Sequence, residues 1–63
     1  MKTIILRKQN NIWTATYLNS PEIKEMFGSN TIPTAFDASV SSKYVYDFIS
    51  SRNKDHKVIV EVF

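Results

Sequence analysis

Apolar residues recur at the helical period along residues 39–53. The side chains on this stripe are Val40, Tyr44, Val45, Phe48 and Ile49. Spacings of i, i+4, i+5, i+8 and i+9 place them on one face of an α-helix. Ser39 or Asp37 is expected to cap this helix, and Lys43 and Asp47 form an i,i+4 pair on its polar face. The pattern predicts one full-length amphipathic helix, with the rest of the chain folded against it.

The first eighteen residues show strand-like alternation and predict a β-hairpin with strands at 2–9 and 12–18. Asn10 and Asn11 separate the strands, and Asn tolerates the positive φ that a two-residue type I′ turn requires. Pairing outward from the turn produces one apolar face, from Lys8–Trp13, Leu6–Ala15 and Ile4–Tyr17. The opposite face is mixed, from Arg7–Thr14, Ile5–Thr16 and Thr3–Leu18. Such a separation is typical of a sheet with one covered face.

Residues 20–28 predict a short helix after the hairpin. Ser20 is positioned as its N-cap, Pro21 suits the first helical position, and Gly28 is placed to end it in the left-handed conformation. The apolar side chains at i, i+3 and i+4 spacing are Ile23, Met26 and Phe27. We expect this face to close one end of the core.

Two further strands are predicted, at 31–36 and 57–63. Pro33 has no N–H, so the first of them should lie at a sheet edge or be irregular there. In the last strand Val58, Val60 and Val62 point inward, and Ile59, Glu61 and Phe63 point outward. If the helix crosses the sheet, this strand runs parallel to the first, through a right-handed connection. Alternatively, it pairs with a second copy of the chain.

The element order is therefore β-β-(short α)-β-α-β. It predicts an α+β fold with one three- to four-stranded sheet and one amphipathic helix packed on one face. The 63 residues make a single domain. Most aromatic side chains are predicted to lie in the core, namely Trp13, Tyr17, Phe27, Phe36, Tyr44 and Phe48.

Composition narrows the classes of function. Cys is absent, which excludes disulfides and thiolate metal sites. Small folds are commonly stabilised by disulfides, metals or oligomerisation, and the composition leaves oligomerisation open. The net charge is +2 and the pI about 9.1, without a run of Lys or Arg. There is no apolar targeting core and no 18-residue apolar run. We expect a cytoplasmic protein without membrane contact.

His56 is the natural general base at neutral pH, because the chain has no other histidine. It sits in a polar turn at 54–57 and is predicted to be a solvated turn residue. The chain has one glycine, no paired carboxylates and no zinc motif. We expect a protein that is not an enzyme and holds no cofactor or metal.

A resemblance extends this picture. The hairpin strand Ile12-Trp13-Thr14-Ala15-Thr16-Tyr17, followed by a Pro-containing connection, a short strand, an amphipathic helix and a final strand, resembles the HicB-like antitoxin domain. Segment 26–36 also resembles one in small bacterial single-domain proteins. The resemblance implies a partial double-stranded-RNA-binding fold of one sheet and one helix, often dimeric. HicB-type antitoxins carry a separate DNA-binding tail, for which we expect no room after Phe63, so autorepression is not implied.

The side of the sheet away from the helix is predicted to carry a self-association surface. Its apolar residues are Ile5, Leu18, Ile59 and Phe63. Scattered surface residues remain an alternative interpretation. Tyr46, on the polar side of the helix, and Arg7 are predicted partner contacts, because Tyr and Arg are enriched at interfaces.

The sequence thus favours a small non-catalytic protein-interaction module acting as a homodimer, with a protein partner of unknown identity. The alternative is a weak RNA- or DNA-binding domain, suggested by the pI and by Arg7, Lys2, Lys54 and Lys57. A third hypothesis is an enzyme that depends on His56.

Overall fold

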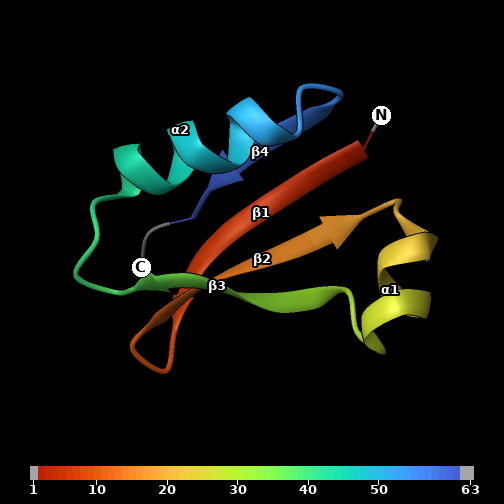
Figure 1. Cartoon of the computed structure of the whole chain (residues 1–63), viewed down its shortest axis with the longest axis horizontal. Helices are drawn as coiled ribbons and strands as arrows, with labels where there is room; N and C mark the ends of the chain where they lie inside the picture. Colours follow the sequence, from red (N-terminus) through yellow and green to blue (C-terminus); the bar gives the residue numbers. More distant parts are fainter. Residues whose placement is uncertain (1, 62–63) are drawn as a thin grey trace.

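The computed structural model describes residues 2–61, which form a sheet with one helix on its face and a shorter helix at its end (Figure 1). The elements are β1 (Lys2–Gln9), β2 (Ile12–Leu18), α1 (Pro21–Phe27), β3 (Thr31–Asp37), α2 (Ser42–Arg52) and β4 (His56–Val60). The four strands lie in the order β3-β2-β1-β4. The predicted α+β fold is confirmed, with all four strands in one sheet.

The hairpin of β1 and β2 has the predicted register. Asn10 and Asn11 have φ of 53° and 64°, the left-handed values that a type I′ turn requires. Lys8 pairs with Trp13, Leu6 with Ala15 and Ile4 with Tyr17. Since side chains alternate along a strand, this register sends the apolar pairs to one side of the sheet.

Strand β4 pairs within the chain. It runs parallel to β1, with Ile4 opposite Val58 and Ile5 opposite Ile59. This pairing is reached because α2 carries the chain from β3, at one edge of the sheet, to the other edge (Figure 1). The strand ends at Val60, earlier than predicted, and Val62 and Phe63 lie outside the described residues.

The hydrophobic core lies between the sheet and α2. We call the side of the sheet that α2 covers the inner face and the opposite side the outer sheet face. The buried apolar residues of the core are Ile4, Leu6, Trp13, Ala15, Val45 and Ile49. Burying a side chain of this kind stabilises the fold by roughly 1.5–3 kcal/mol. The Trp13 indole Nε1–H donates to the Val40 carbonyl at 2.9 Å, which pairs its one polar group.

Helix α2 begins later than the sequence predicts. The predicted caps, Ser39 and Asp37, bond to each other instead, because the Asp37 carboxylate accepts from the Ser39 N–H at 2.8 Å and from its hydroxyl. Ser41 is the N-cap, and its hydroxyl accepts from the Tyr44 N–H at 3.3 Å. Residues 37–40 therefore form a turn, and α2 is shorter than 39–53.

Helix α1 does not close the core. Pro21 and Gly28 begin and end it as predicted, and Gly28 has φ 75°. However, Met26 is 72% exposed and Phe27 56% exposed, and α1 has no buried residue. The prediction was wrong because the helix lies beyond the ends of β2 and β3, while α2 alone covers the inner face (Figure 1). Ser20 precedes the helix, but its hydroxyl makes no capping bond.

The β3 edge and the aromatic residues follow the predictions in part. Pro33 pairs opposite Thr14 on an edge strand, and the register shifts between Ile12 and Thr14, so the strand is irregular near Pro33 as expected. Phe36 and Phe48 pack against the core. Tyr44 was predicted to be in the core but is exposed, because it packs on the outside of Phe36 with ring centroids 5.6 Å apart.

Candidate interaction surface

No helix of residues 2–61 lies over the outer sheet face. Helix α2 packs on the inner face, and α1 stands at one end of the sheet (Figure 1). Strand alternation and register assign side chains from all four strands to the outer sheet face. They are Thr3, Ile5, Arg7, Thr14, Thr16, Leu18, Thr31, Pro33, Ala35, Lys57 and Ile59, with Glu61 directly after β4. Most of these side chains are short or apolar, which suits close contact with another surface.

The apolar centre of this face lies at the junction of β1 and β4. Ile5 and Ile59 are register partners, so the structure brings these two predicted residues side by side. Ile59 is 37% exposed and Ile5 is half-buried. Leu18, 40% exposed, lies at the end of β2 opposite Thr3. Phe63, the fourth predicted residue, lies outside the described part of the chain.

Three threonines of the outer sheet face have hydrogen-bond partners within the sheet. The hydroxyls of Thr16 and Thr31 are 2.9 Å apart, across β2 and β3. Thr14 is buried, and its hydroxyl donates to the Arg7 carbonyl at 3.3 Å. Because these hydroxyls already have partners within the sheet, covering the face would leave few polar groups without a hydrogen bond.

Arg7 lies on the outer sheet face, as predicted, but is already engaged. Its Nε donates to Glu61 Oε1 at 2.5 Å. This hydrogen bond raises the pKa of Arg7 above its usual value, although that group is charged at physiological pH in either case. Arg7 therefore contributes a neutralised pair to the face rather than an unpaired cation.

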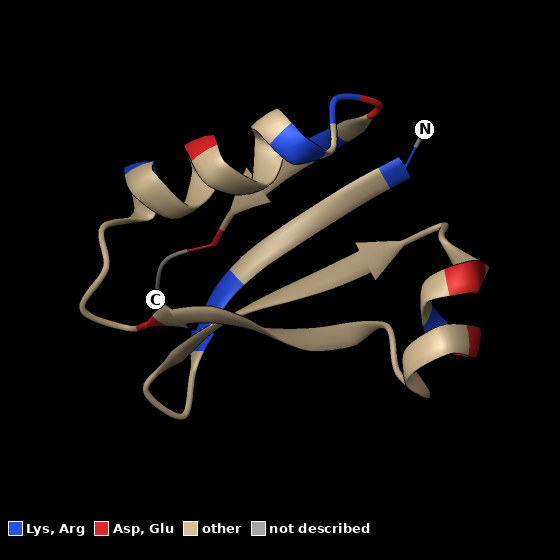
Figure 2. Ribbon diagram, viewed as in Figure 1, with Lys and Arg blue, Asp and Glu red and all other residues tan. Residues whose placement is uncertain are grey.

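The other basic residues are spread over the molecule. Figure 2 shows Lys and Arg on separate elements, with Asp and Glu between them. Lys2 pairs with Glu22 and Lys43 with Asp47, both at 3.2 Å. The Arg52 guanidinium lies 3.6 Å from the centroid of the Phe48 ring. The described residues therefore form no continuous basic stripe on one face.

Tyr46 lies on α2, on the side of the sheet opposite Arg7, so the two predicted partner contacts are not together. Tyr44 and Phe48 contact Phe36 of β3. Tyr46 is about 200° around the helix from each of them. It is exposed and points away from β3, on the flank of α2 nearer the β4 edge.

His56 is not a solvated turn residue, contrary to the prediction. It begins β4, its side chain is only 10% exposed, and its Nδ1 lies 2.7 Å from Asp55 Oδ1. Its ring also meets the Tyr17 ring edge-on at 6.0 Å. The hydrogen bond with His56 lowers the pKa of Asp55, and burial raises the pKa of Tyr17. The prediction failed because the burial of His56 depends on Tyr17 of β2, which is far from it in the sequence.

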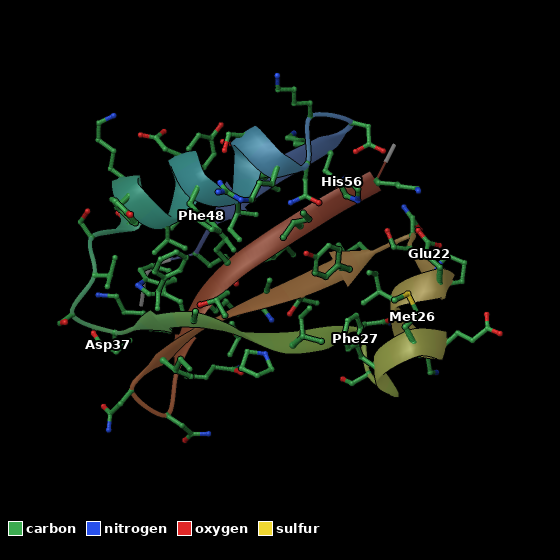
Figure 3. All side chains as sticks on the ribbon, viewed as in Figure 1. Glu22, Met26, Phe27, Asp37, Phe48 and His56 are labelled. Carbon is green, nitrogen blue, oxygen red and sulfur yellow. The ribbon has the colours of Figure 1, made fainter. Side chains whose placement is uncertain are left out.

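Glu22 of α1 lies at the same end of the molecule as His56 (Figure 3). Its pKa is lowered first by a hydrogen bond from its own backbone N–H and then by Lys2. The Lys2–Glu22 pair joins the start of β1 to the first turn of α1. These groups hold the end of the sheet together, and within residues 2–61 no three His, Cys, Asp or Glu side chains gather as a metal site.

A second exposed apolar cluster escaped the sequence reasoning. Met26 and Phe27 both project from α1 at the end of the sheet (Figure 3). The i, i+3, i+4 spacing of apolar residues occurs in both buried and exposed helices, so it does not predict exposure. The feature of the sequence that could have indicated exposure is the shortness of this helix. Seven residues cover little of a sheet face.

Within the described part of the chain, no helix is long and apolar enough to cross a bilayer. Comparison of the chain with family models, with curated proteins and with solved structures yields no match. The likeness to the HicB-like domain therefore stays a prediction, and the proposals below rest on the geometry of the chain itself.

Proposed function

We propose that the chain is a small, non-catalytic protein-interaction module that acts as a homodimer. Its contact surface includes Ile59, which lies beside Ile5 at the apolar centre of the outer sheet face. The observation that supports this proposal is the uneven covering of the sheet: one face packs against α2, and within residues 2–61 no element lies over the other. A second copy is the occupant proposed here, since two-fold dimers are the commonest closed assemblies.

The size of the fold supports self-association. A domain of this length buries only about 60% of the surface of its unfolded chain. Described apolar side chains remain on the outer sheet face, with Ile59 and Leu18 both exposed. Contact of a second copy with part of this apolar area, at Ile59, would add apolar burial without any change in the fold of one chain.

The non-catalytic part of the proposal rests on the environment of His56. Its ring is largely buried between Asp55 and Tyr17, so it is placed to pack rather than to meet a substrate. An enzyme would need a positioned base within reach of bound substrate.

Weak RNA or DNA binding is less well supported. Of the cations that suggested it, Arg7 and Lys2 are engaged with carboxylates. Binding to phosphates would have to use scattered lysines such as Lys54 and Lys57, and its affinity would fall steeply with salt. Retention of the chain on a nucleic-acid column that is lost on Lys57→Ala substitution would favour this alternative.

Light scattering after size-exclusion chromatography tests the proposal at tens of micromolar. We expect a mass twice that of the 7.3 kDa chain. Ile59→Lys should reduce it to the monomer mass, because it would set two like charges opposite each other at the centre of the contact. Met26→Lys is the control, since it introduces a lysine at an exposed apolar position on α1. A monomeric parent chain would contradict the proposal.

A further inference from the structure

We infer that the second copy joins through the open edge of β4, so that two β4 strands pair antiparallel and the two sheets become one of eight strands. This inference rests on the proposed homodimer, because it names where the two copies meet: at Ile59 and along the adjoining β4 edge, with Ile5 and Leu18 left on the open outer sheet face. It places Ile59 on the two-fold axis and makes the two outer sheet faces continuous.

The backbone of β4 is oriented for this pairing. The Glu61 N–H donates to the Leu6 carbonyl of β1 at 2.9 Å. Because backbone groups alternate along a strand, the N–H and C=O groups of Val58 and Val60 point the other way, toward the edge. No other strand of the described chain lies on that side of β4.

The two edges of the sheet differ in how they are protected. On β3, Pro33 lacks an N–H, so this edge is poorly suited to another strand. The β4 edge has no proline and carries the run Val58-Ile59-Val60, whose branched side chains favour strand pairing. An added strand is therefore expected at β4.

One register satisfies both the backbone and the charges. With Ile59 opposite Ile59 of the second copy, Val58 lies opposite Val60, and this pair exchanges both of its hydrogen bonds. The same register sets Lys57 opposite Glu61 of the second copy, once on each side of the axis. Lys57 has no ion pair within the described residues, and Glu61 uses Oε1 for Arg7. Opposite charges in this position stabilise a strand pair.

Tyr46 of α2 lies on the inner side of the proposed interface. Tyr46 lies on the flank of α2 away from β3. In the eight-stranded sheet, the two α2 helices lie on the same side, with Tyr46 of each copy facing the new strand pair. The predicted partner contact at Tyr46 and the apolar centre at Ile59 thus belong to one interface.

Disulfide cross-linking tests the register directly, because the chain contains no cysteine of its own. Ile59 and Ile59 of the second copy form a non-hydrogen-bonded pair, with Cα atoms about 4.5 Å apart, within the range for a disulfide. Ile59→Cys should therefore be captured as a covalent dimer under mild oxidation, read by mass spectrometry. Ile5→Cys is the matched control: three strand spacings separate the two copies, about 14 Å.

The outcomes separate this inference from the homodimer proposal. Cross-linking of Ile59→Cys but not of Ile5→Cys supports strand pairing. Cross-linking of Ile5→Cys at an equal or higher rate overturns it and leaves a face-to-face homodimer. A parent chain that scatters as a dimer while Ile59→Cys fails to cross-link also overturns it. A monomeric parent chain removes both proposals.

Charge reversal provides a second test that does not depend on oxidation. Lys57→Glu should raise the dimer dissociation constant about tenfold, because two attractive pairs become repulsive. Lys54→Glu makes the same substitution in the exposed turn before β4 and should leave the dissociation constant unchanged. A Lys57→Glu dimer as tight as the parent overturns the register.

Discussion

Leu6 and Ile5 are neighbours on β1, yet their side chains enter different environments. Leu6 is fully buried on the inner face, beneath α2, whereas Ile5 is half-buried on the outer sheet face beside Ile59. The inner face holds the fold of one chain together. The outer sheet face is apolar at its centre without being needed for that core. The contrast shows that one strand packs alternate residues into the core and places the others on a face that no other described element covers.

The largest expected effect tests the inner face. Leu6→Ala should lower the free energy of unfolding by about 2–5 kcal/mol, because it leaves a cavity in the core. For a chain of 63 residues, this is comparable to the whole stability of about 3–9 kcal/mol. Urea denaturation followed by Trp13 fluorescence measures it.

Ile5→Ala is the matched variant on the same strand. At concentrations where the chain is monomeric, it should cost less than Leu6→Ala, because Ile5 is already half in water. Equal losses for the two variants would remove the distinction between the faces.

A smaller effect concerns hydrogen bonds on each face. Trp13→Phe leaves the Val40 carbonyl without its indole donor and should lower the free energy of unfolding by about 1–3 kcal/mol. Thr16→Val, on the outer sheet face, removes the hydroxyl that pairs with Thr31 but keeps the side-chain volume. It should cost less, because Thr16 is more exposed than Trp13. Thermal unfolding of both variants compares their losses of stability. A larger loss for Thr16→Val than for Trp13→Phe would contradict the contrast between the two faces.

The smallest effect should come from acid, which acts on neither face. Hydrogen bonds lower the pKa values of three carboxyl groups in the folded chain. The main donor is the Ser39 hydroxyl for Asp37 and the His56 ring for Asp55. For Glu22 it is the residue's own backbone N–H. Groups whose pKa is lowered on folding stabilise the fold above their unfolded pKa. Their contribution is therefore lost as the pH falls below the ordinary values of 3.8 and 4.5.

Chemical denaturation between pH 6 and pH 3, about the range in which carboxylates titrate, measures this loss. Asp37→Asn should reduce the loss of unfolding free energy in acid, because the amide oxygen still accepts from Ser39 but no longer titrates. A larger loss in this variant would contradict a lowered pKa of Asp37 in the folded chain.

Local patterns predicted most of the sheet. Asn10 and Asn11 set the hairpin register, and alternation then assigned Leu6 and Ile5 to opposite faces, as the structure has them. The helical period likewise found Val45 and Ile49 of α2. These predictions succeeded because turn chemistry and side-chain period are properties of the neighbouring residues alone.

The candidate surface was predictable only in part. The sequence predicted Ile5 and Ile59 as outward-facing neighbours if the last strand lay beside the first. In the structure β4 does lie beside β1. The engagement of Arg7 by Glu61 joins residues far apart in the sequence, and the burial of His56 depends on Tyr17. Neither could be read from local sequence, because each needs the positions of two strands at once.

Local patterns along the chain specify the type and order of the elements, the hairpin register and the residues that share each face. Which element lies against each face depends on how the helices and strands pack together. Ile23, Met26 and Phe27 have the spacing of a buried stripe, but α2 already covers the inner face and leaves α1 exposed at its end. The physical reason is that periodicity specifies a direction around a strand or helix, whereas burial depends on which other element occupies that side.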